Sequence, residues 1–533
     1  MNSKTNHRLH QLSRFWRLPT SIVGGLVSSL AFPREGLWPL IFVSVILLLG
    51  AIRGLRFWSA TLVGFAGGFA FYASQIEWMS LYLGPVPWLA LSILEGIIFA
   101  LGMGLIAMIW AWLEHRARGT FKNLIIAAAI ACAWTAREWV SINVPYGGFP
   151  WSRLAQTQST SFLADWVYVG GLPLLTFVIA FIVALTFGFR LATVRGKIIS
   201  ALAMATALII PALIVVPAAA ESGTYVVAAV QGNANAGLFA NTERGSILEN
   251  HIEASKLIGD QPLADEIDVV VWPENASDLS PFKDVAASTT IQNLVNDEFK
   301  VPLIFGTITE RGDKIFNSSI LWEPGVGPTD WYDKKRPVPF AEYVPDRDFW
   351  YQFAPDLIGL ISRGYSFGDR DGIFEVNGTK LGTLICFEIA IDDIGRNLVG
   401  DGAELILSQT NNADFGQSDE TFQQAALARL RAIETGRSLV NISTVGVSEI
   451  YAADGTILAS LPTFEPGVMV TEVPLRTSIT PAMVIGPIFD LANNAVAFLL
   501  GALAIGYRAR RKARDHVDTV ELDESRKQEG NTQ

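Results

Sequence analysis

A free cysteine follows a buried-strand pattern in the second half of this 533-residue chain. The run from Lys380 to Ile385 alternates small and apolar residues, which predicts a strand, and Cys386 and Glu388 follow where that strand should end. Strand ends in layered α/β folds commonly display catalytic groups. Because a lone cysteine is more often a small buried hydrophobe, the catalytic interpretation of Cys386 depends on partners for its thiol.

Histidine, the usual activator of a cysteine nucleophile, is scarce in this chain. Of five histidines only His251 lies in the same polar region as Cys386, in a helix-like run. A Cys-His pair and a Ser-His-Asp triad are therefore disfavoured, and no His/Cys/Asp spacing predicts a zinc site. The remaining chemistry is a carboxylate base with a nearby cation, which lowers the thiol pKa and stabilises an oxyanion.

Two other stretches supply such a carboxylate and such a cation. Glu274 follows the apolar strand pattern 267–272, and apolar neighbours would raise its carboxyl pKa toward the working pH, as a general base requires. Lys334 stands in a row of three cations with Lys335 and Arg336, which could equally be a solvated basic turn. Composition alone does not separate Lys334 from Lys335.

The elements that must position these residues alternate between strands and helices from about residue 223 to 476. This alternation predicts a layered α/β domain. Helices are expected at 242–257, 285–298, 391–398 and 420–435. Strands are expected from Thr224 and at 267–272, 302–309, 318–322, 382–387, 405–409, 438–443 and 456–459.

Apolar stretches frame that domain, and the chain has only 17% charged residues against about 25% in soluble proteins. A membrane helix needs about 20 apolar residues, which the third to seventh stretches and the last one provide. The first two are short and could form a hairpin, lie at the interface or, for the first, be a signal peptide. The stretches lie at about 18–32, 37–52, 57–74, 86–112, 123–142, 163–188, 198–219 and 482–507.

Loop charges orient this array. With eight spans and the N-terminus inside, the short outside loops hold only Arg34 and Arg153. Treating the first two stretches as a pair that does not cross leaves the sidedness of all the others unchanged. The expected organisation is a cytoplasmic segment 1–17, a membrane domain of about seven helices at 18–222, an extracytoplasmic catalytic domain at 223–476, a final transmembrane helix at 477–507 and a cytoplasmic tail at 508–533. The inside loops hold Arg53, Arg56, Arg116, Arg118, Lys122, Arg190, Arg195 and Lys197, and five cations follow residue 507.

Several charged and aromatic residues lie in or near the apolar stretches. Ionisable groups there are costly, and we expect Arg137 and Glu138 to be interfacial or to line a cavity. The aromatic, turn-rich loop 145–151 is expected to anchor the chain at the membrane surface. A net charge of −11 argues against nucleic acid as a partner. Cys132 lies in an apolar stretch apart from Cys386, so we expect no disulfide.

Three motifs in this order resemble those of the nitrilase (carbon–nitrogen hydrolase) superfamily. They are Trp272-Pro273-Glu274, Tyr332-x-Lys334 with Val338-Pro339-Phe340-x-Glu342, and Cys386-Phe387-Glu388. With such a domain inserted before the last of about eight membrane spans, nearly the whole chain resembles the apolipoprotein N-acyltransferase family, the membrane-embedded members of that superfamily. The resemblance implies a multi-span α-helical membrane domain plus an extracytoplasmic α/β nitrilase-like domain, an αββα sandwich.

The resemblance also implies roles. Cys386 matches the nucleophile, Glu274 the general base and Lys334 the oxyanion stabiliser, since the motif lysine comes two residues after Tyr332. Glu342 and Glu388 match supporting glutamates. Asn411 lies in the segment 408–416, which resembles the family's Ser-Asn-Asp-x-Trp-Phe-Gly loop, and the helix after it, which contains Gln424, also resembles a family helix.

Three positions depart from the family pattern. Phe387, expected to support the site, stands where a tyrosine is common, so a hydroxyl is missing. Ala341 replaces a glycine. Asp414 replaces an aromatic residue associated with holding lipid, which affects the acyl-chain contacts more than the chemistry.

The resemblance implies an N-acyltransferase that moves a fatty acyl group from a phospholipid, through a cysteine thioester, to the α-amine of the diacylglyceryl-cysteine of an apolipoprotein. A membrane-bound amidase or nitrilase-type hydrolase and a non-enzymatic lipid- or lipoprotein-binding module are the alternatives. The large membrane part favours lipid substrates, because a simple tether needs one span. The expected protein is a monomer in the bacterial cytoplasmic membrane without cofactor or metal.

Overall fold

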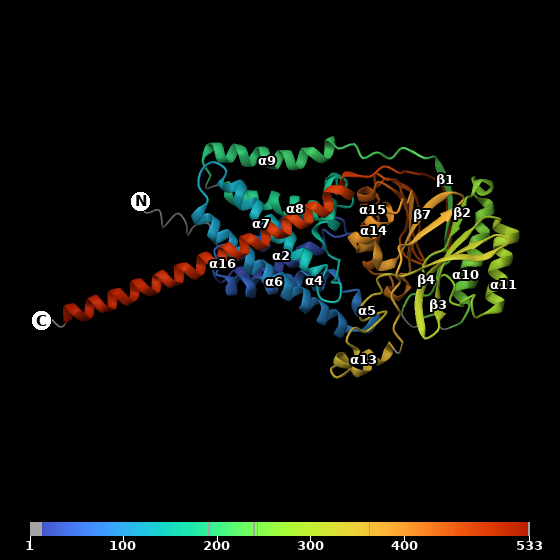
Figure 1. The fold of residues 1–533 in the computed structure, drawn as a ribbon, viewed down its shortest axis with the longest axis horizontal. Helices are drawn as coiled ribbons and strands as arrows, with labels where there is room; N and C mark the ends of the chain where they lie inside the picture. The colour runs from blue at the N-terminus through green and yellow to red at the C-terminus, as the bar shows by residue number, and fades with distance from the viewer. Residues whose placement is uncertain (1–12, 190–191, 238–239, 242, 362, 531–533) are drawn as a thin grey trace.

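The computed structural model describes residues 13–189, 192–237, 240–241, 243–361 and 363–530. A bundle of helices stands on one side of the molecule, and two β-sheets with their covering helices stand on the other (Figure 1). Most of the expected N-terminal segment 1–17, Arg190 and Thr242, the first residue of one expected helix, lie outside the described residues.

The helical part matches the apolar stretches. Five described helices are long and apolar enough to cross a membrane: Pro85–Arg116, Lys122–Ser141, Phe162–Gly188, Val194–Leu213 and Pro481–Arg510. The α-helices described in this part are α2 (Arg17–Ser29), α3 (Leu40–Ile52), α4 (Phe57–Gln75), α5 (Met79–Leu83), α6 (Pro85–Arg116), α7 (Lys122–Ser141), α8 (Trp166–Gly188), α9 (Val194–Leu213) and α16 (Pro481–Gly530).

The first two stretches form short helices. Each has 13 residues and is about 20 Å long at 1.5 Å per residue, less than the ~30 Å hydrocarbon core. Small residues let α2 approach its neighbours closely. The Ser21 hydroxyl donates to the Val63 carbonyl of α4 at 2.8 Å, and the Ser44 hydroxyl of α3 donates to the Gly24 carbonyl at 2.7 Å. That these helices and α4 cross the membrane stays a prediction.

Arg137 and Glu138 of α7 are buried, so the expectation that they are interfacial was wrong, whereas a cavity-lining position stays a prediction. Arg137 lies 4.6 Å over the Phe99 ring and donates to the Tyr72 hydroxyl. Glu138 accepts from the Thr176 hydroxyl at 2.7 Å and from the Leu154 amide at 3.0 Å. Buried protein groups contact both charges away from water, as is usual for ionisable residues within membrane segments.

The second part contains two six-stranded sheets. The first has the order β12-β1-β2-β3-β4-β5 and the second β11-β10-β9-β8-β7-β6. The first sheet's strands are β1 (Thr224–Gln231), β2 (Val269–Val271), β3 (Leu303–Arg311), β4 (Lys314–Glu323), β5 (Gly327–Asp333) and β12 (Gly467–Pro474). The second sheet's strands are β6 (Ile373–Val376), β7 (Thr379–Ile385), β8 (Leu405–Thr410), β9 (Ser438–Ser443), β10 (Ser448–Tyr451) and β11 (Ile457–Leu461).

Helices cover both outer faces, so the layers are those of the predicted αββα sandwich. Helices α10 (Ser246–Ser255) and α11 (Val285–Asn293) cover the first sheet, and α14 (Asp392–Gly400) and α15 (Glu420–Thr435) cover the second. Strand β7 shows the alternation that builds these layers: Ile385 packs between the sheets, whereas Leu384 packs outward toward α14 and α15. Two short helices, α12 (Arg347–Tyr351) and α13 (Pro355–Leu360), project beside the bundle (Figure 1).

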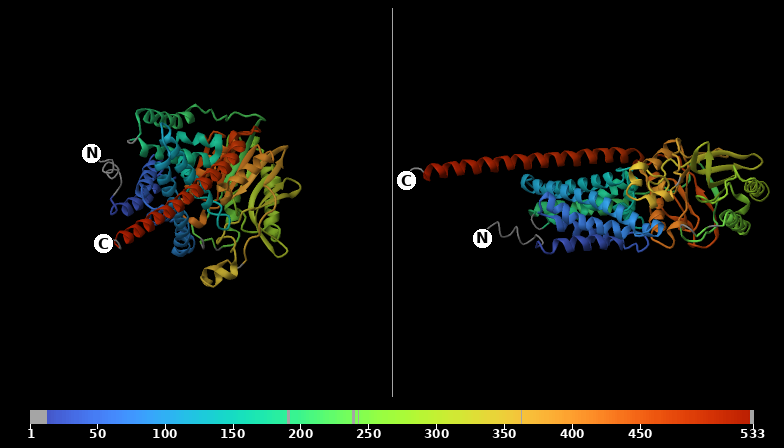
Figure 2. Two further views of the ribbon diagram at one scale, coloured as in Figure 1. Left: turned by 60° about the vertical axis from the view of Figure 1, so that its left-hand side comes forward. Right: turned by 90° about the horizontal axis from the view of Figure 1, so that it is seen from below.

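The membrane bundle packs on the α14–α15 layer. Leu427 and Ile433 of α15 share one buried apolar cluster with Leu172 and Leu175 of α8. The views in Figure 2 agree with this order, with the bundle at one end, the sheets at the other, and α16 running along the bundle and beyond it. The sandwich is thus fixed to one end of the helices.

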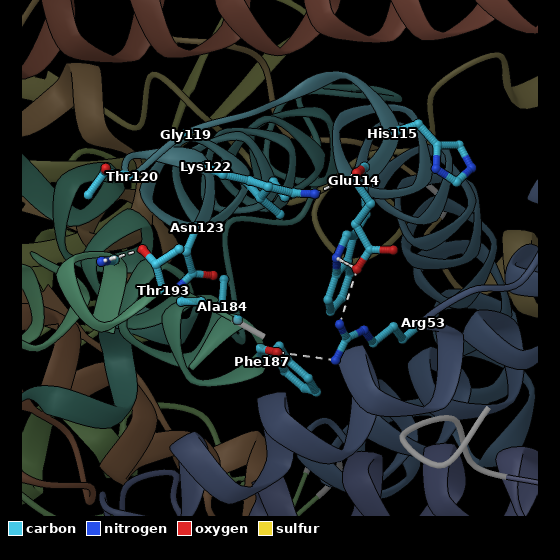
Figure 3. Close-up of a pocket in the computed structure, with 15 residues that line it drawn as sticks. Arg53, Glu114, His115, Gly119, Thr120, Lys122, Asn123, Ala184, Phe187 and Thr193 are labelled. Carbon is cyan, nitrogen blue, oxygen red and sulfur yellow. Dashed lines mark hydrogen bonds and ion pairs between the residues drawn. The ribbon is translucent and has the colours of Figure 1, made fainter. Parts of the chain in front are cut away.

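The basic loops gather at the opposite end of the bundle. A cavity of about 320 Å³ there is lined by residues of the loops and helix ends that join α3 to α4, α6 to α7 and α8 to α9 (Figure 3). Arg53 and Lys122 are among them, with Glu114 paired to Arg53 at 3.1 Å. The positively charged loops predicted to share one side of the membrane therefore share one end of the bundle.

Candidate active site

Cys386 begins a tight turn directly after β7. The turn is a short 3-10 helix, Cys386–Ala390, and Cys386 has φ +53, a conformation that non-glycine residues rarely adopt. The Glu388 side chain accepts a hydrogen bond from the Ile385 amide at 2.9 Å and closes the turn. Such strained positions cluster at functional sites, and this one presents a partly buried thiol at the end of the strand.

Glu388 ties this turn to the end of β5. Its fully buried carboxyl accepts from the Tyr332 hydroxyl at 2.9 Å, from the Lys335 amide at 2.8 Å and from the Arg336 amide at 3.0 Å. Burial raises the pKa of Glu388, and these donors oppose that shift. Because Lys334 lies between Tyr332 and Lys335, the same contacts set where the lysine stands relative to Cys386.

Glu274, Lys334 and Glu342 meet in one buried cluster. The Lys334 ammonium lies 3.5 Å from Glu274 Oε1 and 3.0 Å from Glu342 Oε1, and its side chain is 1% exposed. Asn317 of β4 donates to both carboxylates, at 2.7 Å and 3.0 Å. The Val338 amide donates to the second oxygen of Glu342. Lys334 and the Asn317 amide thus hold together Glu274 and Glu342, which are 68 positions apart in the chain.

The structure distinguishes Lys334 from Lys335 as the cation of the cluster, a choice that composition alone did not make. Lys335 points away from the cluster and pairs with Asp371 at 2.8 Å, where both side chains are about one quarter exposed. Lys334, by contrast, is the cation beside Glu274.

The electrostatics favour a neutral thiol beside a carboxyl group that can take its proton. Burial raises the pKa of the Cys386 thiol, the charge of Glu274 raises it further, and Lys334 lowers it. Burial also raises the pKa of Glu274, against the effect of Lys334. Burial would lower the pKa of Lys334, but Glu342 and Glu274 outweigh it, so the lysine stays charged. This set can move a proton from sulfur and stabilise negative charge.

A second group of polar side chains reaches Cys386 from α15. The Gln424 side-chain amide lies 3.5 Å from the Cys386 sulfur, and Asn412 donates to Gln424 at 2.8 Å and to Glu420 at 2.6 Å. Sequence reasoning gave these residues no role. Gln424 stands in the helix that resembled the family, which is the only signal that pointed to it.

Asn411, predicted to support the site, forms a local contact. Its side-chain oxygen accepts from the Ala413 amide at 3.1 Å within its own loop. Its neighbour Asn412 is the residue connected to Gln424. Asn411 can therefore support the site only indirectly, by holding its own loop in shape.

Aromatic side chains from the membrane part surround the turn. Trp151 lies parallel to Phe387, with ring centroids 6.3 Å apart, and against Trp78 at 5.9 Å. Phe415 packs on Trp78 at 5.0 Å and on Tyr82 at 5.7 Å. The loop 145–151, expected to anchor the chain at the membrane surface, therefore contributes a buried tryptophan to the junction with the catalytic half. Asp414, next to Phe415, has its pKa raised to about 6 by burial.

His251 lies in the core rather than with these residues. Its ring packs on Trp272, and its Nδ1 lies 2.8 Å from the Ile247 carbonyl. Burial lowers its pKa to about 4, so the imidazole is neutral. His251 is therefore a buried core residue, and a site without a catalytic histidine stays a prediction.

Comparisons with known proteins agree with the two-part architecture. Residues 24–185 match the family model described as apolipoprotein N-acyltransferase N-terminal domain, and residues 226–480 match the model described as carbon–nitrogen hydrolase. A helical membrane part joined to a carbon–nitrogen hydrolase domain defines a membrane-embedded member of the nitrilase superfamily.

Similarity to individual proteins extends over nearly the whole chain. An apolipoprotein N-acyltransferase from Mycolicibacterium smegmatis is 31% identical over 92% of this chain and 86% of its own length. One from Vibrio vulnificus is 28% identical over 96% of this chain and all of its own. A solved amidase of the nitrilase superfamily from Nesterenkonia covers 48% of this chain and 93% of its own, with 18% identity and a TM-score of 0.36. The chain belongs to the apolipoprotein N-acyltransferase family.

Proposed function

We propose that this protein transfers a fatty acyl group from a membrane phospholipid to the α-amine of the diacylglyceryl-cysteine of an apolipoprotein. The observation that carries the proposal is the buried cluster of Lys334, Glu274 and Glu342, whose charges act on the Cys386 thiol in the turn after β7. Family membership and the names of the relatives support the same reaction. A site beside the helices suits two substrates that are both held in the membrane.

In the first half-reaction Cys386 attacks the ester carbonyl of the phospholipid. Glu274 accepts the thiol proton as the carbon–sulfur bond forms, and the Lys334 ammonium stabilises the tetrahedral oxyanion together with backbone N–H groups. Collapse of the intermediate breaks the carbon–oxygen bond. Glu274 returns the proton to the leaving oxygen, so a lysophospholipid departs and Cys386 carries the acyl group as a thioester.

In the second half-reaction the lipoprotein amine attacks that thioester. Glu274 removes a proton from the attacking nitrogen, Lys334 again stabilises the oxyanion, and the carbon–sulfur bond breaks. The proton held by Glu274 passes to the sulfur, which restores the thiol. The product is an N-acylated lipoprotein, and no cofactor or metal enters either half.

The supporting residues act by position in this scheme. Glu342 shares Lys334 with Glu274 and keeps the ammonium in place. Glu388 holds the cysteine turn against the end of β5. Phe387 packs on Trp151 and joins the turn to the membrane part. Asn411 shapes the loop whose next residue contacts Gln424.

The charge distribution supports a catalytic domain on the extracytoplasmic side of the cytoplasmic membrane. Arg53, Arg118 and Lys122 belong to loops at the end of the bundle opposite the sheets, and positive loops favour the cytoplasm. The chain holds all proposed site residues itself, so the proposed reaction needs no residue from a second copy.

Labelled phospholipid incubated with the purified full-length protein tests this function. We expect a hydroxylamine-sensitive acyl adduct on Cys386 that moves to a synthetic diacylglyceryl-cysteine peptide, and no adduct in Cys386→Ser. Cys132→Ser is the matched control and should form the adduct at the wild-type rate. Full activity in Cys386→Ser would refute the proposal. An adduct that water releases while the peptide stays unmodified would identify a hydrolase of the amidase type instead.

A further inference from the structure

Helix α15 carries two consecutive glutamines that face different parts of the molecule. The Gln423 side-chain oxygen accepts from the indole N–H of Trp151 at 2.6 Å and of Trp78 at 3.1 Å, and its amide donates to the Gln75 carbonyl at 3.0 Å. All three partners belong to the membrane part. Successive residues on a helix differ by about 100°, so Gln424 turns from the bundle toward Cys386.

The hydrogen bonds around Asn412 fix which end of the Gln424 amide faces the sulfur. The Asn412 oxygen accepts from the Ser443 hydroxyl at 2.5 Å, so its nitrogen faces Gln424 and Glu420. An amide nitrogen can only donate, and it therefore bonds the Gln424 oxygen at 2.8 Å. The Gln424 nitrogen is left facing Cys386 at 3.5 Å.

We propose that Gln424 is a catalytic residue of the acyl transfer, whose side-chain amide donates to the Cys386 sulfur and stabilises it as a thiolate. The inference deepens the proposed function and rests on it. Three carboxyl groups, those of Glu274, Glu342 and Glu420, disfavour negative charge on this sulfur, and Lys334 is the cation that favours it. A neutral N–H donor on the side away from Lys334 adds stabilisation without a further charge.

The hydrogen bond from Gln424 to the Cys386 sulfur should be stronger during the reaction than in the resting enzyme. A thiolate accepts hydrogen bonds more strongly than a thiol or a thioester sulfur, because bonds to charged acceptors are about twice as strong as neutral ones. The amide therefore favours the states in which sulfur bears charge, on attack in the first half-reaction and on departure in the second. The Gln423 contacts hold this turn of α15 against the membrane part, so the bundle helps to position the donor.

Alkylation of Cys386 by iodoacetamide as a function of pH measures this effect without lipid. In the full-length protein carrying Cys132→Ala, we expect Gln424→Met to lower the rate at pH 7.5 about tenfold and to move the titration midpoint up by about one pH unit. Gln424→His keeps an N–H within reach and should stay within about threefold of wild type. Gln417→Met, at an exposed glutamine before the same helix, is the control and should leave the profile unchanged.

Two results would overturn the inference. One is a Gln424→Met profile that superimposes on wild type, and the other is a Gln424→His rate as low as that of Gln424→Met. Gln424→Asn, whose amide is one methylene too short to reach the sulfur, supplies a second donor-free variant should the methionine lower the melting temperature. If wild-type Cys386 alkylates normally but takes no acyl group from phospholipid, the proposed function fails while the alkylation profiles still decide the role of Gln424.

Discussion

At the scale of single residues, the proposed site has a carboxyl group where many cysteine enzymes have an imidazole. Glu274 can serve as a base because burial raises its pKa above the ordinary value near 4.5, which brings it closer to the pH at which the enzyme works. The carboxylate is still stabilised by Lys334 and by the Asn317 amide, so it remains available to accept a proton.

The pH dependence of acylation should report this carboxyl group. A protonated Glu274 cannot accept the thiol proton, so the rate should fall as the pH falls through its raised folded-state pKa, above 4.5. Removing a general base costs about 10²–10⁴ in rate, and Glu274→Gln should lose that much and lose the acid limb. Adduct formation from phospholipid between pH 4 and 9 measures both, with the exposed Glu243→Gln as control. An unchanged acid limb in Glu274→Gln would assign that limb to another group.

The two neighbouring lysines should differ sharply in effect. Lys334→Ala removes the oxyanion partner, which is expected to cost about 10²–10³ in rate, and leaves two buried carboxyl groups without their cation. Lys335→Ala breaks a half-buried pair with Asp371 and should stay within about threefold. The peptide acylation rate measures both variants, and thermal unfolding separates loss of chemistry from loss of structure. The reverse order of effects would contradict the assignment.

At the scale of elements, the positions of the proposed catalytic groups depend on where strands end and on how closely the strands approach one another. Glu274 follows β2, Lys334 follows β5 and Cys386 follows β7, so the three come from strand ends in two facing sheets. The backbone of the neighbouring strand β3 lies close against the segment that carries Glu274. A glycine stands at the point of closest approach.

Gly306 in β3 should therefore be intolerant of a side chain. A Cβ there would lie 2.6 Å from Glu274 Cα and from the Asn275 nitrogen, both backbone atoms that cannot rotate away. We expect Gly306→Ala to lower the acylation rate at least tenfold, because a shift of about 1 Å at a catalytic group can cost about 10² in rate. Gly259→Ala, where a Cβ meets nothing within 4 Å, is the control. Wild-type activity in Gly306→Ala would show that the Glu274 segment adapts.

At the scale of the whole molecule, buried charges join the two parts. Arg153, from the loop after α7, pairs with Asp392 at the start of α14 at 2.8 Å, and Arg431 of α15 pairs with the same carboxylate at 3.1 Å. Burial opposes ionisation of Asp392, but these arginines outweigh it and hold its pKa well below the usual range. A pair of this kind is costly to break, so the sandwich should stay fixed on the bundle.

The orientation in the membrane can be tested by labelling single cysteines in a Cys132→Ala, Cys386→Ala background. Val326→Cys lies on an exposed turn of the sandwich, and Arg118→Cys lies in the loop at the opposite end of the bundle. In intact spheroplasts an impermeant maleimide should label the first and spare the second, and permeabilised cells should show both. Labelling of Arg118→Cys alone would place the sandwich in the cytoplasm and exclude phospholipid transfer at the outer leaflet.

The sequence by itself predicted the properties that local patterns carry. Apolar stretches, loop charges and the alternation of strands with helices predicted the membrane helices, their shared basic end and a layered α/β domain, whereas the αββα sandwich followed from the family resemblance. It did not predict β5, β6, β10 and β12 as strands. These four pair in antiparallel fashion, and all of them lie at or next to a sheet edge. Their mixed polar and apolar residues lack the buried-run pattern of β1, β2 or β8.

Which polar side chains contact one another could be read only from the folded structure. The family motifs indicated Glu274, Lys334 and Cys386. Without those motifs, the identification of Lys334 as the cation depends on its contact with Glu274, which is far away in the chain. The buried position of Arg137 and the contact from Gln424 to the Cys386 sulfur also depend on distant residues. The interior position of Trp151 likewise depends on Gln423, 272 residues away. Periodicity specifies which face of an element is apolar, whereas hydrogen bonds between distant side chains depend on how whole layers pack, and that information is not local.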